Sequence, residues 1–452
     1  MYPRLQLKLL ELELRGRDMT KARLDGLYFL AIGILLFLVC GIAFERMSPA
    51  SMQDFRVLYN PARCLLHDCD PYSQVDVFRV SRQFGRIYDT DSKTVREIVT
   101  RYIYPPTAFV MTIPFALLPW EAAHLLWLGI TIVTMVLASL AIWDLGAEAP
   151  ILAGLMTALV IANCESIVIS GNAAGIVDSL CVIAVWCFLR ERFVWLGVLS
   201  LAMGLLVKPH NTGLIWMCFL LSGGVLRKRA LQTLMVTTTL GAPCIFWVYH
   251  QSPDWPQGLR NNIAVFSEHG GLADPGPACT TANGPGILTN LQAIFSLLRD
   301  DPHFYNTATY AACILLFFVW MFVVWRNERT QGTFLVSLAV SSSLSMLPLY
   351  HRIYDAKLLL LTIPACTVVW AKNKILRWFA LLLNLAALLA TADLPQAVLI
   401  GEANHLRSTS VVNSRISAAA IDAFPAPLSV ALITLFYLGL GLTHSMSLRS
   451  RK

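Results

Sequence analysis

Residues 27–44 read LYFLAIGILLFLVCGIAF, an apolar run without a charged side chain. A bilayer core takes about 20 helical residues to cross, so this run predicts a transmembrane helix. Similar runs recur along the chain, of whose 452 residues 56% are hydrophobic and only 14% are charged. Barrel strands would instead alternate over about ten residues. We therefore expect an all-α polytopic integral membrane protein, because helices satisfy their own backbone polar groups inside lipid.

Apolar runs set the expected extent of the membrane domain. Besides the first, they cover residues 107–119, 122–143, 151–169, 173–189, 193–207, 212–226, 231–249, 308–325, 332–349, 357–370, 375–392 and 428–444. Several are short for a hydrocarbon core of about 30 Å, so we expect some tilted, broken or re-entrant segments among about eleven to thirteen in all. One transmembrane domain thus spans 27–444, between a tail at 1–26 and a tail at 445–452.

Two long loops interrupt the apolar runs. The first, at 45–106, contains amphipathic stretches at 51–68 and 74–101. Such stretches favour helices that lie flat in the membrane interface. The second loop, at 250–306, is rich in Gly, Pro, Asn and His.

Cysteine usage bears on the compartment and on metals. Cys64 and Cys69 lie in the first long loop and can form a local disulfide if that loop faces an oxidising compartment. No CxxC or His-rich spacing typical of a metal site occurs, so we expect no metal and no cofactor.

Basic residues gather in short connectors between the apolar runs. Such clusters mark the cytoplasmic side, so the net charge of +7 does not indicate a nucleic-acid partner. The clusters lie at 190–192, 227–229, 326–329, 372–374 and 449–452. We expect a multi-pass protein of the plasma (inner) membrane with cytoplasmic termini, and with both long loops in the periplasm or exterior. The region between residues 107 and 172 stays unoriented, because its connectors carry no Lys or Arg.

Polar patches far apart in the sequence fall on the non-cytoplasmic side by this rule. They are Asp54, Tyr104-Pro105-Pro106, Gly171-Asn172, Lys208-Pro209-His210-Asn211 and His351-Arg352-Ile353-Tyr354-Asp355. An acid, a lysine, a histidine and an arginine at one face suit a phosphate-bearing lipid. Simpler explanations stay open: Asp54 can cap a helix or pair with a nearby arginine, and Lys208 and Arg352 can extend to lipid headgroups.

The order and spacing of these patches resemble glycosyltransferase family 87, the family of polyprenyl-phosphate-mannose-dependent mannosyltransferases. The resemblance extends over about residues 50–370 and rests on Asp54-Phe55-Arg56-Val57-Leu58-Tyr59, Asp70-Pro71-Tyr72, Tyr104-Pro105-Pro106, Gly171-Asn172 and Lys208-Pro209. It implies a GT-C membrane fold, a non-cytoplasmic active site and a lipid-phosphate sugar donor. It also implies that Asp54 is the catalytic aspartate of the first loop and that His351 is a donor-site histidine. At Gly171-Asn172 the chain departs from the Gly-Gln that relatives often carry.

The resemblance and the residue types together predict a hexosyltransferase of the cell envelope. It would transfer a hexose, with mannose as the first candidate, from a polyprenyl-phosphate sugar to a glycolipid or glycan acceptor, inverting the anomeric carbon. Asp54 would be the general base, and the donor phosphate would be bound by Lys208, His351 and Arg352. The residues expected to line the site are Tyr59, Tyr72, Tyr104, Asn172, His210 and Tyr354.

Three other classes of protein remain open, and one of them is a non-catalytic scaffold, against which the joint presence of Asp54, Lys208 and His351 argues. A lipid-linked glycan ligase or polymerase would share the donor and the membrane face. A transporter or flippase would place ionisable residues near the bilayer midplane and in matched repeats, whereas here they gather at one face. The sugar, the acceptor and the oligomeric state do not follow from the residues.

Overall fold

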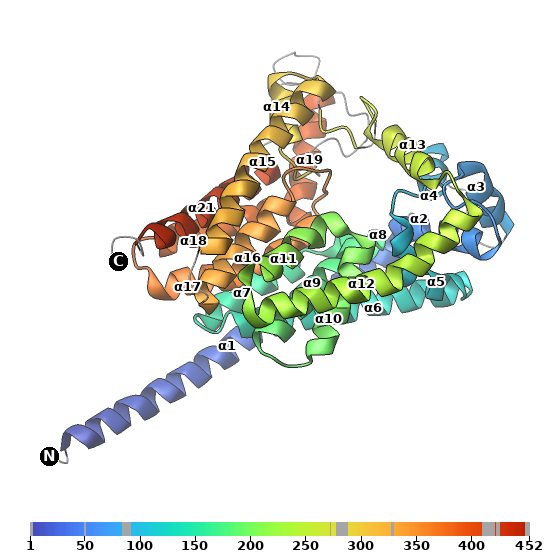
Figure 1. Ribbon diagram of the computed structural model, residues 1–452. Coiled ribbons are helices and arrows are strands. Elements are labelled where there is room, and N and C mark those ends of the chain that lie inside the picture. The colour runs from blue at the N-terminus through green and yellow to red at the C-terminus, as the bar shows by residue number, and fades with distance from the viewer. Residues whose placement is uncertain are drawn as a thin grey trace.

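The computed structural model describes residues 3–48, 51–83, 92–271, 273–276, 288–326, 330–408, 421 and 425–447. Over these ranges the chain is helical and contains no strand (Figure 1). A single antiparallel bridge joins Leu288 to Arg352 there. The expected all-α polytopic class is confirmed.

The helices follow one another with short connections. In chain order they are α1 (Pro3–Met47), α2 (Gln53–Leu66), α3 (Gln74–Gln83), α4 (Lys93–Val99), η1 (Pro106–Ala108), α5 (Phe109–Ala116), α6 (Trp120–Leu145), α7 (Pro150–Ile161), α8 (Glu165–Ser170), α9 (Ala173–Leu189), α10 (Val194–Val207), α11 (Pro209–Ser222), α12 (Gly224–Gln251), α13 (Trp255–Ser267), α14 (Gln292–Leu298), α15 (Pro302–Arg326), α16 (Gln331–Ser345), η3 (Asp355–Leu361), α17 (Thr362–Lys372), α18 (Arg377–Ala390), α19 (Asp393–Ser408) and α21 (Pro425–Ser447).

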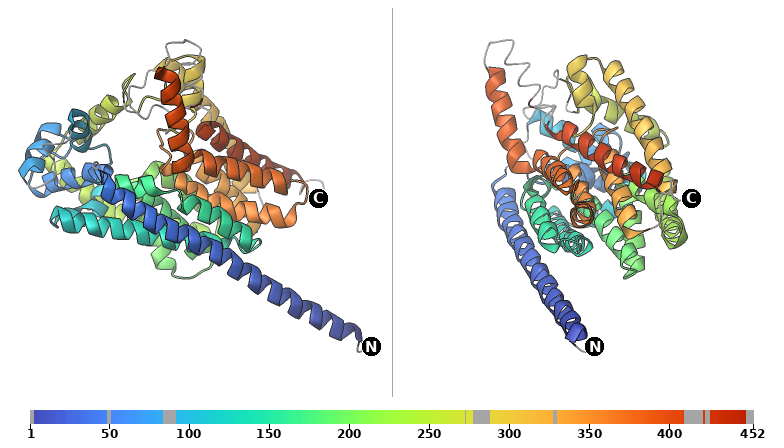
Figure 2. Two further views of the ribbon diagram at one scale, coloured as in Figure 1. Left: turned by 180° about the vertical axis from the view of Figure 1, so that it is seen from behind. Right: turned by 90° about the vertical axis from the view of Figure 1, so that its left-hand side faces the viewer.

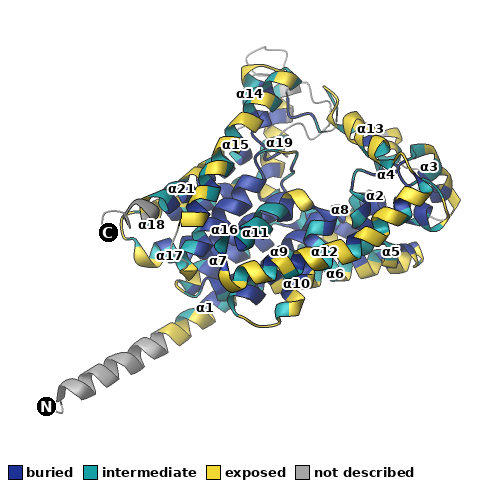
Figure 3. Cartoon of the chain, viewed as in Figure 1, coloured by how far each residue is buried: buried dark blue, intermediate teal, exposed yellow. Residues whose placement is uncertain are grey.

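Five helices within the described residues are long and apolar enough to cross a membrane: α1 from Met19 onward, α6, α12, α15 and α21. The pair α18 and α19, bent by 64°, would form a sixth crossing. The outward faces of these helices carry exposed apolar side chains, such as Leu35, Phe246 and Phe318, whereas α9 and α16 are mostly buried (Figure 3). This distribution fits lipid around the outside and a packed interior.

Two of the expected runs fold as broken helices. Residues 107–119 form only η1 and α5, because Pro119 disfavours helical geometry at the residue before it and the helix restarts at Trp120. Residues 151–169 divide into α7 and α8, and Asn163 at the break hydrogen-bonds back to the Leu159 carbonyl at 2.9 Å. The expected total of eleven to thirteen segments therefore includes helices shorter than a crossing.

Small residues let α1 and α7 pack side by side (Figure 2). A Cβ atom added at Gly154 would lie 2.1 Å from the Gly26 carbonyl oxygen, and one added at Gly33 would lie 2.6 Å from the Ala158 Cα. Close backbone approach of this kind is the usual way for membrane helices to gain van der Waals contact.

Ion pairs indicate the face at which the connector between α6 and α7 lies, which the basic clusters of the sequence do not determine. Asp144 accepts from the Arg190 Nε at 2.7 Å, and Glu148 lies 2.9 Å from the Lys372 Nζ. The connector between α6 and α7 therefore lies at the face that carries the basic clusters. A cavity of about 940 Å³ opens at this face beside Arg190 and Lys372. It is at the far end of α9 from Asn172, so we do not assign it to the site described below.

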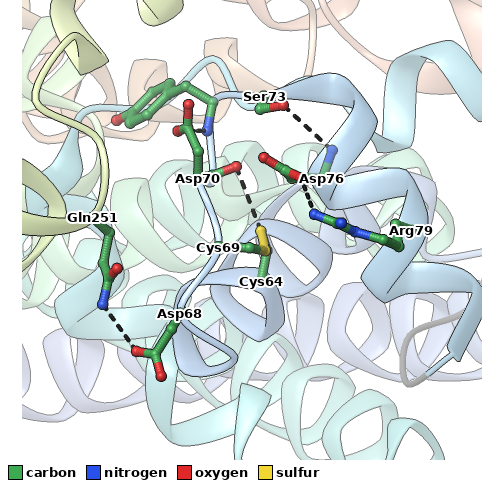
Figure 4. The surroundings of a disulfide bond; sticks show 9 residues. Cys64, Asp68, Cys69, Asp70, Ser73, Asp76, Arg79 and Gln251 are labelled. Carbon is green, nitrogen blue, oxygen red and sulfur yellow. Dashed lines mark hydrogen bonds and ion pairs between the residues drawn. A yellow bond between two sulfur atoms is a disulfide. The ribbon is translucent and has the colours of Figure 1, made fainter.

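At the opposite face the two long loops pack against each other. Cys64, in the last turn of α2, forms a disulfide with Cys69 (Figure 4). Gln251 at the end of α12 donates to Asp68 inside the disulfide loop at 2.9 Å. From the second loop, Asn262 of α13 donates to the Tyr72 and Tyr102 carbonyls at 3.1 Å each. The disulfide that the sequence left open is thus present, and α2, α3, α4 and α13 form an outer layer.

Candidate active site

The start of α2 is docked onto the turn between α8 and α9. Met52 has a φ of 56°, and its N–H donates to the Ile169 carbonyl at 2.7 Å. Gly171 has a φ of 65°, and a Cβ there would lie 2.4 Å from the Met52 sulfur. Phe55 stacks on Trp127 with ring centroids 4.4 Å apart. These contacts leave Asp54, in the first turn of α2, facing Asn172.

Asn172 joins three distant parts of the chain. Its Nδ2 donates to the Asp54 Oδ2 at 2.8 Å. Its Oδ1 accepts from the Lys208 Nζ at 3.0 Å and, as the N-cap of α9, from the Ala174 N–H at 2.9 Å. The Asn172 side-chain amide therefore donates to a carboxylate and accepts from a cation. Asp54 is half-buried, whereas Asn172 is buried.

Lys208 is neutralised by a partner that sequence reasoning did not assign to the site. Its Nζ lies 2.6 Å from the Asp355 Oδ1, and both side chains are buried. The other Asp355 oxygen accepts from the Arg352 N–H at 3.0 Å. Burial by itself would raise the pKa of the Asp355 carboxyl. The positive charge of Lys208 outweighs this effect and lowers that pKa to about 2. The signal was present in the sequence, because Asp355 ends the stretch that begins at His351.

His351 lies behind the site, and both of its ring nitrogens contact protein atoms. Its Nδ1 lies 3.0 Å from the Leu349 carbonyl oxygen, and its Nε2 lies 3.1 Å from the Asn211 Oδ1. The ring is fully buried. Because both ring nitrogens already contact protein atoms, we propose a supporting role for His351 in place of the expected direct contact with the donor phosphate.

The other cation of that stretch lies closer to the open side. The Arg352 side chain is partly exposed, and its Nε donates to the Tyr350 hydroxyl. Burial disfavours its charge, but the surrounding Tyr350, Tyr354 and Asp54 raise the pKa of Arg352. His210 is exposed and packs with its ring centroid 5.0 Å from that of His351.

Among the predicted lining tyrosines, Tyr104 and Tyr354 lie close to Lys208. The Lys208 Nζ lies 5.5 Å from the centroid of the Tyr354 ring, within the range of a cation–π contact. Burial raises the pKa of Tyr104 to about 12, and Lys208, Asp54 and Asp355 all act on it electrostatically. Tyr104 is therefore a hydrogen-bond donor at neutral pH.

Tyr59 and Tyr72 do not line the site as expected. The Tyr59 hydroxyl donates to the Leu118 carbonyl at 2.8 Å, and its buried ring packs edge-on against Trp120. The Tyr72 hydroxyl donates to the Tyr104 carbonyl at 2.9 Å. Both residues follow apolar spacing on the buried face of the outer layer, so Tyr59 holds α2 in place and Tyr72 supports Tyr104.

Behind the site lie Asn211, a residue of the polar patches to which sequence reasoning gave no role, and Asp178, which it missed. Asn211 of α11 donates to the Asp178 Oδ1 at 2.9 Å and lies 3.4 Å from the Asp355 Oδ1. Asp178 lies inside apolar α9 and is 1% exposed. A lone acid in an apolar run was its signal, because such residues are costly in membrane helices. Within the described ranges no group of three or more His, Cys, Asp or Glu side chains is arranged to hold a metal ion.

Comparison with known proteins matches residues 102–349 to the family described as glycosyltransferase family 87. The matched segment contains Tyr104, Asn172, Lys208 and His210, and it is shorter than the expected 50–370. Asp54 precedes it, and His351 to Asp355 follow it. No curated protein and no solved structure matches the chain. Because the family match covers more than half of the 452 residues, the chain belongs to glycosyltransferase family 87.

Proposed function

We propose that this glycosyltransferase transfers a hexose, with mannose as the first candidate, from a polyprenyl-phosphate sugar to a glycolipid or glycan acceptor. The observation that carries the proposal is the hydrogen-bonded chain from Asp54 through Asn172 to Lys208. It joins an acid of the first long loop to residues inside the family-matched segment. A half-buried carboxylate held in this way is available to a substrate and fixed in direction.

In the proposed reaction Asp54 is the general base. The acceptor hydroxyl gives its proton to the Asp54 carboxylate as its oxygen forms a bond to the anomeric carbon. The bond from that carbon to the phosphate oxygen breaks, and the electron pair leaves with the polyprenyl phosphate. A single displacement of this kind inverts the anomeric centre, and a general base typically contributes about 10²–10⁴-fold.

The leaving phosphate needs positive charge near its oxygens. Arg352 offers a guanidinium, whose forked donors match phosphate geometry. Lys208 contributes less than its formal charge, because Asp355 lies 2.6 Å from its Nζ. Tyr104 and His210 add donors at the same side. A phosphate leaving group accompanied by these side chains is expected to depart without a metal ion.

Several features support a non-cytoplasmic site in the plasma membrane. The Cys64–Cys69 disulfide lies on the same side as Asp54, and disulfides persist in oxidising compartments. The basic residues Arg190 and Lys372 lie at the opposite face, beside the connector between α6 and α7. We therefore place the active site in the periplasm or exterior and both termini in the cytoplasm.

The donor class can be tested with the wild-type protein in proteoliposomes that contain a membrane lipid extract as acceptor source. Radiolabelled polyprenyl-phosphate mannose, glucose and arabinose are compared with the corresponding nucleotide sugars. We expect transfer from a polyprenyl-phosphate sugar and none from nucleotide sugars, with EDTA having no effect. Transfer from nucleotide sugars, or activity abolished by EDTA and restored by divalent ions, would contradict the proposed donor or the proposed metal independence.

A further inference from the structure

The hydrogen bonds behind the site cannot all form if Asp178 is a charged carboxylate and His351 is a neutral imidazole. The His351 Nδ1 faces the Leu349 carbonyl oxygen at 3.0 Å, and a carbonyl can only accept, so Nδ1 must carry a proton. A neutral imidazole then has an acceptor at Nε2. That nitrogen lies 3.1 Å from one end of the Asn211 amide, and the other end lies 2.9 Å from the Asp178 carboxyl.

Two arrangements satisfy these contacts, and both need one additional proton. In the first, His351 is an imidazolium that donates to the Asn211 oxygen, while the Asn211 NH₂ donates to a charged Asp178. In the second, Asn211 is turned over: its NH₂ donates to a neutral His351, and its oxygen accepts from a protonated Asp178. This second arrangement gives up the weak contact of the Asn211 NH₂ with the Asp355 Oδ1 at 3.4 Å. A charged Asp178 beside a neutral His351 would leave two acceptors facing each other across the amide.

Burial favours the second arrangement. Asp178 is 1% exposed, and its Oδ2 has no hydrogen-bond partner among the described residues. A charged carboxylate in that setting would carry a large desolvation cost, which the Asn211 amide and the Leu358 backbone offset only in part. Burial also lowers the pKa of His351, which favours the neutral imidazole. The neighbouring charges act on both groups. Asp355 of η3 disfavours a charged Asp178 and favours a charged His351, whereas Lys208 at the start of α11 opposes both effects. Asp355 and Lys208 also pair with each other, and neighbouring His210 is neutral.

We propose that Asp178, Asn211 and His351 form a positioning unit that shares one proton, with Asp178 as a buried carboxylic acid. The unit rests on the proposed function and deepens it. His351 holds the turn of residues 349–355 through the Leu349 carbonyl, and its own carbonyl accepts from the Thr289 N–H at 3.0 Å. Arg352, which we assign to the donor phosphate, lies on that turn. The shared proton on Asp178 of α9 therefore helps to hold Arg352 in place, through Asn211 and His351.

The protonation pattern can be read without any transfer assay. Full-length protein with ¹⁵N-labelled histidine in lipid nanodiscs is studied by NMR, and the signal of His351 is identified by its loss in His351→Gln. We expect a neutral ring with the proton on Nδ1 across the neutral pH range. A His351 ring that carries its proton on Nε2 alone would overturn the proposal, whatever the activity of the enzyme.

Variants of Asp178 separate the shared proton from a purely structural role. In Asp178→Asn the new NH₂ donates to the Asn211 oxygen, so we expect activity within about threefold of wild type and an alkaline limb of the pH profile shifted upward or absent. In Asp178→Leu that oxygen is left unpaired, so we expect a loss of at least about tenfold, mainly as a higher KM for the donor. Ser179→Ala, whose hydroxyl bonds only within α9 to the Gly175 carbonyl, is the matched control.

Equal impairment of Asp178→Asn and Asp178→Leu in correctly folded protein would contradict the proposal, because it would show that a carboxyl group itself is required. Retained activity and an unchanged pH profile in both variants would contradict it as well. If wild type shows no transfer while the NMR pattern holds, the assigned function fails and the proton-sharing unit stands.

Discussion

At the scale of single residues, the site is a set of matched polar pairs and contains few free charges. Lys208 illustrates this, because its ammonium contacts the carboxylate of Asp355 and the amide oxygen of Asn172. A lysine at the end of an apolar run is interpreted, from the sequence alone, as a phosphate ligand or a contact to a lipid headgroup. Its partner lies 147 positions further along, and no local pattern indicates such a pairing. We therefore propose Arg352, and not Lys208, as the main phosphate-binding residue.

The Lys208–Asp355 pair gives a prediction at this scale. Lys208→Met leaves a buried carboxylate without its cation, so we expect a loss of about 3–5 kcal/mol in the free energy of unfolding. The double variant Lys208→Met with Asp355→Leu should regain most of that stability but not the transferase activity. Thermal unfolding in detergent and the transfer assay measure the two effects. A single Lys208→Met variant as stable as wild type would contradict the assigned ion pair.

The pair also has a defined pH response. Lys208 lowers the pKa of Asp355 to about 2, below the ordinary value for an aspartate. Its contribution to stability is therefore present above about pH 4 and is lost as pH falls toward 2. The same unfolding measurement at descending pH should show this loss in wild type and not in the double variant.

At the scale of elements, glycine contacts decide how closely helices approach. Gly154 and Gly129 both lie within helices, but their surroundings differ. A Cβ at Gly154 would lie 2.1 Å from a carbonyl oxygen of α1, whereas nothing lies within 4 Å of a Cβ at Gly129. The close approach of α1 to α7 could not be foreseen from the sequence, because each glycine alone is compatible with an exposed or a buried position.

This difference predicts opposite effects for the same substitution. Gly154→Ala must push α1 away from α7, so we expect a lower unfolding temperature. Gly129→Ala is the matched control, and it should raise stability by up to about 1 kcal/mol through the better helix propensity of alanine. Equal unfolding temperatures for the two variants would contradict the packing of α1 against α7.

At the scale of the whole molecule, the sequence predicted the class, most helices and the segregation of charge between two faces. Hydrophobic runs and basic clusters carry that information, because the bilayer imposes them directly. The sequence also brought Asp54, Asn172, Lys208 and Arg352 to one face. It indicated no role for Asp355 or Asn211, which lie in the polar patches, and it did not single out Asp178, because buried polar pairing depends on helix packing. It also counted broken helices such as α7 and α8 as single runs.

The orientation of the molecule can be checked by cysteine labelling in intact cells. Asp76→Cys lies on α3 in the outer layer, and Lys372→Cys lies at the basic face beside Glu148. A membrane-impermeant maleimide should label the first variant in intact cells and the second only after permeabilisation, with wild type as the background. The reverse pattern would place the site in the cytoplasm.

The central claim is that Asp54 is the base of a lipid-linked glycosyl transfer, and one comparison tests it most directly. Asp54→Asn is assayed beside wild type in proteoliposomes with the active polyprenyl-phosphate sugar, at equal protein levels. Asp76→Asn, which removes a carboxylate paired with Arg79 on the surface of the same loop, is the control. We predict that Asp54→Asn lowers the turnover by about 10²–10⁴-fold, while Asp76→Asn transfers at the wild-type rate. Wild-type transfer by Asp54→Asn would contradict the account.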